Sequence, residues 1–169
     1  MEIVGGMMDG SISYPPNEPR ETRIVFGPKL GQDQKIGYLE RVPVLENCSM
    51  RQLRAISRIA TVLETPAGQV LARAGEPGDH FFFIIDGAAR VEVPPQSHHG
   101  VGPGEFFGEM SLLDGGPRSA TVLADTPVRL LVVHRRDFWK LLKEAPALTE
   151  QILLTLSQRV RRAEKAVSA

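Results

Sequence analysis

Hydrophobic residues follow two different periods along this chain, and the changes between them mark three parts. Leu53, Ile56 and Ile59 recur at helical spacing, and Ser49 is placed to cap the helix that they predict. After position 134 the helical period returns in RRDFWKLLKEAP, which predicts a short helix ended by proline, and in ALTEQILLTLSQRVRRAEKAV, which predicts a long one. The long helix carries an apolar stripe of Leu148, Ile152, Leu156, Val160, Ala163 and Val167.

Between the helical parts, short apolar runs are separated by turns rich in glycine and proline. The run HFFFIID is continuously apolar, as in a strand buried on both faces, whereas ARVEV alternates between apolar and polar positions. SATVLADTPVRLLVVH predicts two strands joined by a turn. Strands this short are typical of a small barrel or sandwich. PPQSHHGVGPG fits poorly as a strand, because its two prolines cannot donate ladder hydrogen bonds, and we predict a loop there.

The same pattern divides the chain into a tail and one domain. The first 36 residues are rich in glycine and proline and show no sustained period, so we expect a flexible tail over 1–36. The domain is expected over 37–169, with the β-rich part at about 62–134 and the C-terminal helices at about 135–167. A hydrophobic content of 42% over 169 residues is sufficient for its core.

Composition and charge exclude several classes of protein. Lysine plus arginine and aspartate plus glutamate number 20 each, so no net field favours direct nucleic-acid binding. The single cysteine, Cys48, excludes a disulfide framework and a cysteine-based metal site. No apolar run approaches the roughly 20 residues that cross a bilayer, and the N-terminus lacks a signal-peptide pattern. We therefore expect a cytoplasmic protein without membrane insertion.

The stretch GEFFGEMSLLDGGPRSATV holds the strongest candidate site. Glu109 and Arg118 could form a structural salt bridge, act as a catalytic pair, or hold two ends of one ligand. A hydrolase would need a second carboxylate, and the one that follows Glu109 in this stretch, Asp114, stands in LDGG, the context of a turn. Because this catalytic interpretation has so little support, we do not expect an enzyme.

The ligand interpretation accounts for more of the residues. Gly108 permits close approach of a ligand to the backbone, and a helical turn at EMSLL would direct free N–H groups at an anion. Arg118 offers a charged fork for phosphate oxygens, and Ser119 adds a hydroxyl. Glu109 only accepts hydrogen bonds, which suits a sugar hydroxyl. The stretch therefore predicts a pocket for a small phosphorylated sugar.

FFGEMSLLDGGPRSATV resembles the phosphate-binding cassette of cyclic-nucleotide-binding domains, which reads approximately F-G-E-x-A-L, then P-R-[Ser/Thr/Ala]-A. LERVPVLENCS, PAGQVLARAGEPGDHFFFIIDGAARVEV and DFWKLL are similar to the family's first helical region, first four strands and penultimate helix. The resemblance covers about Tyr38 to Val160. It implies a mainly β fold: an eight-stranded antiparallel, jelly-roll-like β-roll with an N-terminal helical segment, a short cassette helix and two C-terminal helices.

The resemblance also implies a role for each residue of the site. The implied phosphate ligands are Arg118, Ser119 and the backbone N–H groups of Ser111 and Leu112. The implied ribose ligands are Gly108 and Glu109, and Val91 would form the apolar wall of the purine site. No cofactor or metal is implied, because the ligand is the nucleotide itself. We favour cAMP over cGMP, because threonine at the position of Ser119 often accompanies a preference for cGMP.

Two further clusters have alternative interpretations. His98 and His99 are adjacent, and we expect a solvated loop there rather than a metal site. The long helix ends in a basic cluster, and we expect a solvated face. The family implies the alternative that one of its arginines closes over the purine. The basic cluster consists of Arg159, Arg161, Arg162 and Lys165.

Members of the family regulate an attached kinase, channel or DNA-reading module, and none of these is recognisable in the sequence. We expect a sensor that signals through movement of its C-terminal helices, with a partner protein or a second copy at the last helix. Two alternatives remain open. One is a β-roll interaction or dimerisation module that no longer binds nucleotide, and the other is the sensor fragment of a larger channel or transcription regulator.

Overall fold

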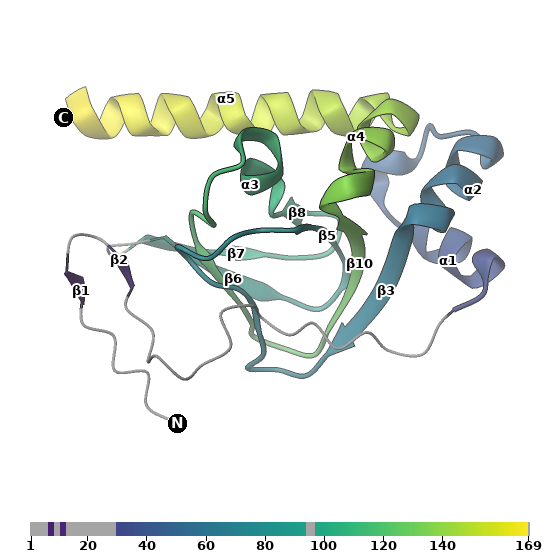
Figure 1. Ribbon diagram of the computed structural model, residues 1–169, viewed down its shortest axis with the longest axis horizontal. Coiled ribbons are helices and arrows are strands. Elements are labelled where there is room, and N and C mark those ends of the chain that lie inside the picture. Colours follow the sequence, from purple (N-terminus) through teal and green to yellow (C-terminus); the bar gives the residue numbers. More distant parts are fainter. Residues whose placement is uncertain (1–6, 9–10, 13–29, 94–96, 169) are drawn as a thin grey trace.

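Two four-stranded antiparallel sheets form the centre of the molecule (Figure 1). The structure is a computed structural model and describes residues 7–8, 11–12, 30–93 and 97–168. The first sheet has the strand order β3-β10-β5-β8 and the second β4-β9-β6-β7. Their bounds are β3 Ala60–Thr65, β4 Val70–Ala72, β5 His80–Asp86, β6 Ala89–Val93, β7 Ser97–Val101, β8 Phe106–Phe107, β9 Thr121–Ala124 and β10 Val128–His134. The expected eight-stranded antiparallel roll with flanking helices is confirmed.

Helices cover one end of the roll and cross above it (Figure 1). They are α1 Gln32–Leu39, the 3-10 helix η1 Pro43–Leu45, α2 Met50–Ile59, α3 Glu109–Asp114, α4 Arg135–Glu144 and α5 Pro146–Ser168. The predicted cap of α2 is present, since Ser49 Oγ accepts from the Gln52 N–H. α1 begins at Gln32, within the segment that we assigned to the tail, and buries Ile36. The described part of the remaining tail is a short ladder of β1 Met7–Met8 and β2 Ser11–Ile12.

The continuous apolar run of β5 is explained by burial on both faces. Phe82 and Ile84 lie in the apolar cluster between the two sheets. Phe81, Phe83 and Ile85 point the other way and lie in a second cluster, beneath the helices. Because successive side chains of a strand alternate between faces, a strand with a core on each side has no polar position.

The second cluster joins the outer face of the first sheet to the helices. α4 contributes Phe138 and Leu141, and the first turns of α5 contribute Leu148 and Ile152. Further along α5 the residues of the apolar stripe no longer lie in the core, and Val160 is 56% exposed. Figure 1 shows α5 passing over α3 and extending beyond the sheets. The expected apolar stripe therefore has a buried beginning and an exposed end.

The segment around the two adjacent histidines forms a strand, which corrects our prediction of a loop. β7 pairs antiparallel with β6, so that His99 lies opposite Val91 and His98 opposite Glu92. β7 is an edge strand of its sheet, and the two prolines precede it in the segment 94–96, outside the described residues. Both histidines are exposed. Within the described ranges, no three histidine, cysteine or carboxylate side chains gather as a metal site would require.

None of the described helices combines the length and the apolar character that crossing a bilayer needs.

Candidate functional site

A sharp turn leads the chain from β8 into the short helix α3. Gly108 adopts φ +94° at this turn, a conformation that is strained for residues with a Cβ. A Cβ built on Gly108 would lie 2.8 Å from the His80 carbonyl oxygen. Gly115, at φ +72°, ends the helix. We call the segment 108–119 the cassette, and both of its helix boundaries depend on glycine.

Arg118 extends from the end of the cassette back beneath α3. Its side chain is buried and donates to two main-chain carbonyls, Gly108 O at 2.9 Å and His80 O at 2.7 Å. The guanidinium carbon lies 5.8 Å from the centroid of the Phe82 ring. Gly78 leaves the space for it, because a Cβ at Gly78 would lie 2.5 Å from the guanidinium carbon. The arginine is therefore held by two backbone oxygens, one at the start of β5 and one at the turn into α3.

The charge of Arg118 has no direct counter-ion within the described part of the chain. None of the ion pairs formed there includes Arg118. Burial lowers the pKa of its guanidinium from the usual high value, and the nearby carboxylates of Asp79 and Glu109 oppose that shift. A buried cation whose direct partners are neutral carbonyls favours the approach of an anion.

Glu109 is also buried, at 1% exposure, but its partner comes from the far end of the chain. Arg159 Nη1 of α5 lies 2.8 Å from Glu109 Oε1 and 3.2 Å from Met110 Sδ. This contact corrects two interpretations. The salt bridge of Glu109 is made with Arg159 and not with Arg118, and Arg159 is not part of a solvated face, although its neighbours Arg161 and Arg162 are exposed.

The other residues that we selected lie around the same helix. Ser111 and Leu112 are buried in α3, and Ser119 is exposed, with its hydroxyl 3.6 Å from Met110 Sδ. Val91 comes from the second sheet and is buried in the cluster between the sheets, which also contains Phe82 and Phe107. The structure thus brings the cassette residues together, and Val91 lies in the cluster that includes Phe82, the ring over which the Arg118 guanidinium lies.

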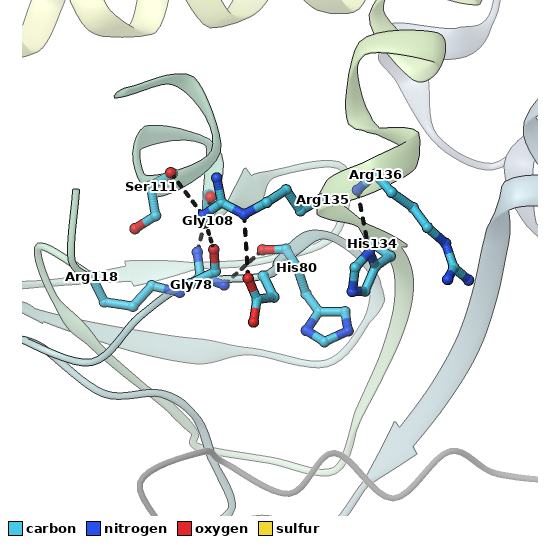
Figure 2. A network of polar contacts seen from close by, with 9 residues as sticks. Gly78, His80, Gly108, Ser111, Arg118, His134, Arg135 and Arg136 are labelled. Atoms are coloured by element: carbon cyan, nitrogen blue, oxygen red, sulfur yellow. Dashed lines mark hydrogen bonds and ion pairs between the residues drawn. The ribbon is translucent and has the colours of Figure 1, made fainter. Parts of the chain in front are cut away.

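Our sequence interpretation missed the segment that supports Arg118 from below. Gly78 belongs to the turn before β5, His80 is the first residue of β5, and Arg135 begins α4. The Arg135 side chain donates to Gly78 O and to Ser111 O, and Figure 2 shows Arg118 and Arg135 converging on Gly78. Glycine in PGDH is a weak signal in the sequence, and no spacing links Arg135 to α3.

His80 and His134 form a second pair beside this network. Their ring centroids are 5.2 Å apart and nearly perpendicular, and His134 Nδ1 accepts the Arg136 N–H at the start of α4. Burial lowers the pKa of His80, and the neighbouring His134 and Arg118 lower it further, while Asp79 opposes the shift. The folded protein therefore resists protonation of His80.

We expect the free energy of unfolding to decrease as the pH falls below about 6.5, the ordinary pKa of histidine. The unfolded chain then takes up a proton that the folded chain excludes, whereas above this pH the stability is fully present. Denaturant unfolding between about pH 5 and pH 8 measures the effect. His80→Asn keeps the carbonyl that binds Arg118 and should flatten this dependence. An equal slope in both proteins would contradict the prediction.

Two packed sheets with a glycine-bounded cassette and a buried arginine make this domain a β-roll with a candidate anion site. A family model described as the cyclic nucleotide-binding domain matches residues 62–145. The chain belongs to this family, whose domains are regulatory rather than catalytic. The matched range includes every site residue that we selected from the sequence, whereas Arg159 lies beyond it.

Similar proteins come from both channels and regulators. A cyclic nucleotide-gated potassium channel of Mesorhizobium japonicum is 42% identical over 118 residues, which cover 70% of this chain and 33% of the channel. The catabolite activator protein of Thermus thermophilus superimposes with a TM-score of 0.63 and 26% identity, over 75% of this chain and 62% of that one. The regulatory domain of Toxoplasma gondii PKA, solved with cAMP, superimposes with a TM-score of 0.62 and 22% identity, over 72% and 49%.

Proposed function

We propose that this chain is a cytoplasmic sensor of cyclic nucleotides that binds cAMP in preference to cGMP, without catalysis and without a further cofactor. One observation carries the proposal. Arg118 is a buried cation with no direct counter-ion among the described residues, and it lies in the cassette of a domain that belongs to the cyclic nucleotide-binding family. A cyclic phosphodiester carries the single negative charge that this position favours.

Each end of the cassette would take a different part of the nucleotide. The cyclic phosphate would be bound by Arg118, by the Ser119 hydroxyl and by the first N–H groups of α3. The buried Glu109 carboxylate and the Gly108 backbone would accept hydrogen bonds from the ribose hydroxyl. The purine would lie against Val91. Helix N–H groups without an intrahelical acceptor and charge-assisted bonds to arginine favour this arrangement. The N–H groups concerned are those of Ser111 and Leu112.

Calorimetric titration with cAMP, cGMP and 5′-AMP tests the proposal. We expect saturable binding of both cyclic nucleotides, with cAMP tighter, and little binding of 5′-AMP, whose phosphate is not closed onto the ribose. Protein free of co-purified nucleotide that binds neither cyclic nucleotide would reject the sensor. The alternative would then be a β-roll retained for protein contacts. A preference for cGMP would reject only the assignment of the purine.

The contact between α5 and the cassette supports signalling through the C-terminal helices. Arg159 and the ribose hydroxyl would both use the Glu109 carboxylate, so nucleotide binding and the present position of α5 compete for one group. A ligand shifts a conformational equilibrium only by its different affinity for the two states. Competition at Glu109 supplies such a difference, and α5 is the element that would move.

Arg159→Ala should raise the affinity for cAMP roughly fivefold, because a partly exposed ion pair contributes about 1 kcal/mol and each 1.4 kcal/mol is tenfold. Arg162→Ala removes a charge from the exposed face of the same helix and serves as the matched control. Calorimetry of the three proteins measures the effect. A loss of affinity in Arg159→Ala alone would contradict competition and support the alternative that Arg159 closes over the purine.

The exposed half of α5 is the surface that we propose for the output of the sensor. Leu153 is 62% exposed, Leu154 53% and Val167 87%, on a helix whose end extends past the roll. A partner protein or a second copy would cover these side chains. The chain spans 33% of the length of the Mesorhizobium japonicum channel, which is consistent with a sensor fragment of a larger protein.

Sedimentation velocity with and without cAMP distinguishes a second copy from a separate partner.

A further inference from the structure

The exposed residues of the helices α2 and α4 are all either basic or apolar. We call this set the basic face. It consists of Met50, Arg51, Arg54 and Arg58 of α2 and of Arg136, Trp139, Lys140 and Lys143 of α4. α2 contains no acidic residue, and the acidic residues of α4, Asp137 and Glu144, are only partly exposed. The exposed charge on these two helices is therefore positive.

α2 and α4 lie side by side, so that their outer sides form one surface. Ala60, directly after α2, is paired with Val133, close to the start of α4. At the other ends of the two helices, burial raises the pKa of the Cys48 thiol, and the nearby carboxylate of Glu144 raises it further. Both helices direct apolar residues into the same cluster, so their exposed sides point away from it. Figure 1 shows the two helices at the same end of the roll.

Most cations of the basic face have no carboxylate partner among the described residues. Arg136 lies 3.6 Å from Asp137, and none of the other ion pairs formed there includes a member of the face. The adjoining segments add exposed carboxylates at Asp33 of α1 and at Glu46 before α2, fewer than the cations of the face. The face therefore keeps a positive charge, although the whole chain has a net charge of zero.

Two apolar side chains stand among these cations. Trp139 is 62% exposed and Met50 is 46% exposed. The ring of Phe138, next to Trp139, is buried, and the two ring centroids are 5.9 Å apart. The indole ring thus lies outside the core on a packed base. An indole combines an apolar body with one N–H donor, which favours the boundary between lipid chains and headgroups.

The composition of the basic face fits a lipid surface better than a protein interface. The core of a protein interface is depleted in charged residues, lysine above all, whereas here lysine and arginine outnumber the apolar side chains. Near an anionic leaflet, each lysine or arginine adds to the binding. Their long side chains can keep the charges at the headgroups while a neighbouring tryptophan enters the boundary region.

We propose that the basic face of α2 and α4 binds the surface of a bilayer that contains anionic phospholipids, with Trp139 as its apolar anchor. The groups recognised are the negatively charged headgroups, and no helix has to enter the hydrocarbon region. The contact would hold one end of the roll against the membrane. It does not depend on the nucleotide site, and so it goes beyond the proposed function.

Titration of the full chain with vesicles tests the proposal, and Trp139 reports on it directly as the only tryptophan of the chain. With phosphatidylcholine vesicles that contain about one quarter phosphatidylserine, the emission should shift to shorter wavelength and the protein should sediment with the vesicles. Pure phosphatidylcholine should bind at least roughly tenfold more weakly. Raising the ionic strength from about 0.1 M to about 1 M should weaken binding to the anionic vesicles, because salt screens exposed charges.

The combined variant Arg54→Gln and Arg58→Gln should weaken binding to the anionic vesicles by at least roughly tenfold, since each cation near the leaflet contributes about fivefold. Trp139→Ala should weaken it by at least roughly threefold, as measured by sedimentation. The combined variant Arg161→Gln and Arg162→Gln is the matched control, because it removes the same charge from the exposed part of α5. It should keep the binding within roughly twofold of the parent.

The proposal is overturned if the parent protein binds neither kind of vesicle, or binds both equally. It is overturned as well if the control on α5 loses as much binding as the variant on α2. Binding of soluble polyglutamate without binding of anionic vesicles would also overturn it, since the face would then fit an acidic protein segment. Should the variant on α2 not fold, Lys140→Gln with Lys143→Gln removes the same charge from α4 and decides by the same criteria.

Discussion

Replacing Arg118 by alanine should weaken the binding of cAMP by about a hundred- to ten-thousand-fold. Two charge-assisted hydrogen bonds to phosphate contribute about 1.5–3 kcal/mol each, and 1.4 kcal/mol corresponds to a factor of ten. The site offers no substitute within the described residues, because the nearest arginine of the network, Arg135, is already bonded to Asp79 and to two carbonyls. Calorimetric titration of the parent and the variant measures the loss.

The variant needs a check on folding, because Arg118 also satisfies two buried carbonyls. Leaving Gly108 O and His80 O without their donor costs about 1–3 kcal/mol each at most, which a domain of ordinary stability survives. Thermal unfolding of Arg118→Ala confirms that the binding experiment uses folded protein. Binding equal to that of the parent would show that the phosphate does not lie at Arg118.

Two further substitutions make this result specific. Arg118→Lys keeps the charge and loses the planar fork, so it should retain part of the affinity. Glu109→Gln should cost less than Arg118→Ala, because the amide oxygen still accepts from a hydroxyl. A greater loss in Glu109→Gln would mean that the ribose contact contributes more than the phosphate contact.

Phe82→Ala should lower the free energy of unfolding by about 3–5 kcal/mol, the range for a buried phenylalanine. Phe82 is fully buried between the two sheets, and its ring stacks on Phe107 with centroids 4.7 Å apart. The same ring lies below the Arg118 guanidinium, so the cavity would also remove a support of the site. Denaturant unfolding followed by circular dichroism measures the change in stability.

Phe82→Leu is the matched control and should cost considerably less, because it keeps most of the buried apolar volume. Trp139→Phe changes an aromatic side chain that is 62% exposed and should leave the stability within about 0.5 kcal/mol. A loss below about 1.5 kcal/mol in Phe82→Ala would show that the core between the sheets closes around the missing ring.

Much of the secondary structure could be predicted because each element has a local signal. The helical period around Leu53 and the cap at Ser49 specify α2, and the double burial of β5 explains its continuous apolar run. The edge strand β7 was missed because its sequence has no apolar alternation, and its hydrogen bonds to β6 come from a strand that precedes it. The pairing of such an edge strand depends on its partner strand, whereas β-propensity describes only the residues of the strand itself.

The cassette residues lie together, since Gly108, Glu109 and Arg118 stand within one short stretch around α3. Their binding roles stay predictions. The partners of these residues are distant in the sequence, as Arg159 is from Glu109, and no local pattern connects them.

By itself, the sequence determined the order of most elements, the glycines at which the chain must turn, and the residue types of the candidate site. These depend on interactions within a few residues, such as periodicity, caps and positive φ. Only the tertiary structure decided that Arg159 pairs with Glu109, that Arg118 is buried with no direct counter-ion among the described residues, and that Arg135 joins α4 to the cassette. Each of these contacts joins segments that approach one another only after the two sheets and the last helices have packed, so burial and charge, rather than spacing, set them.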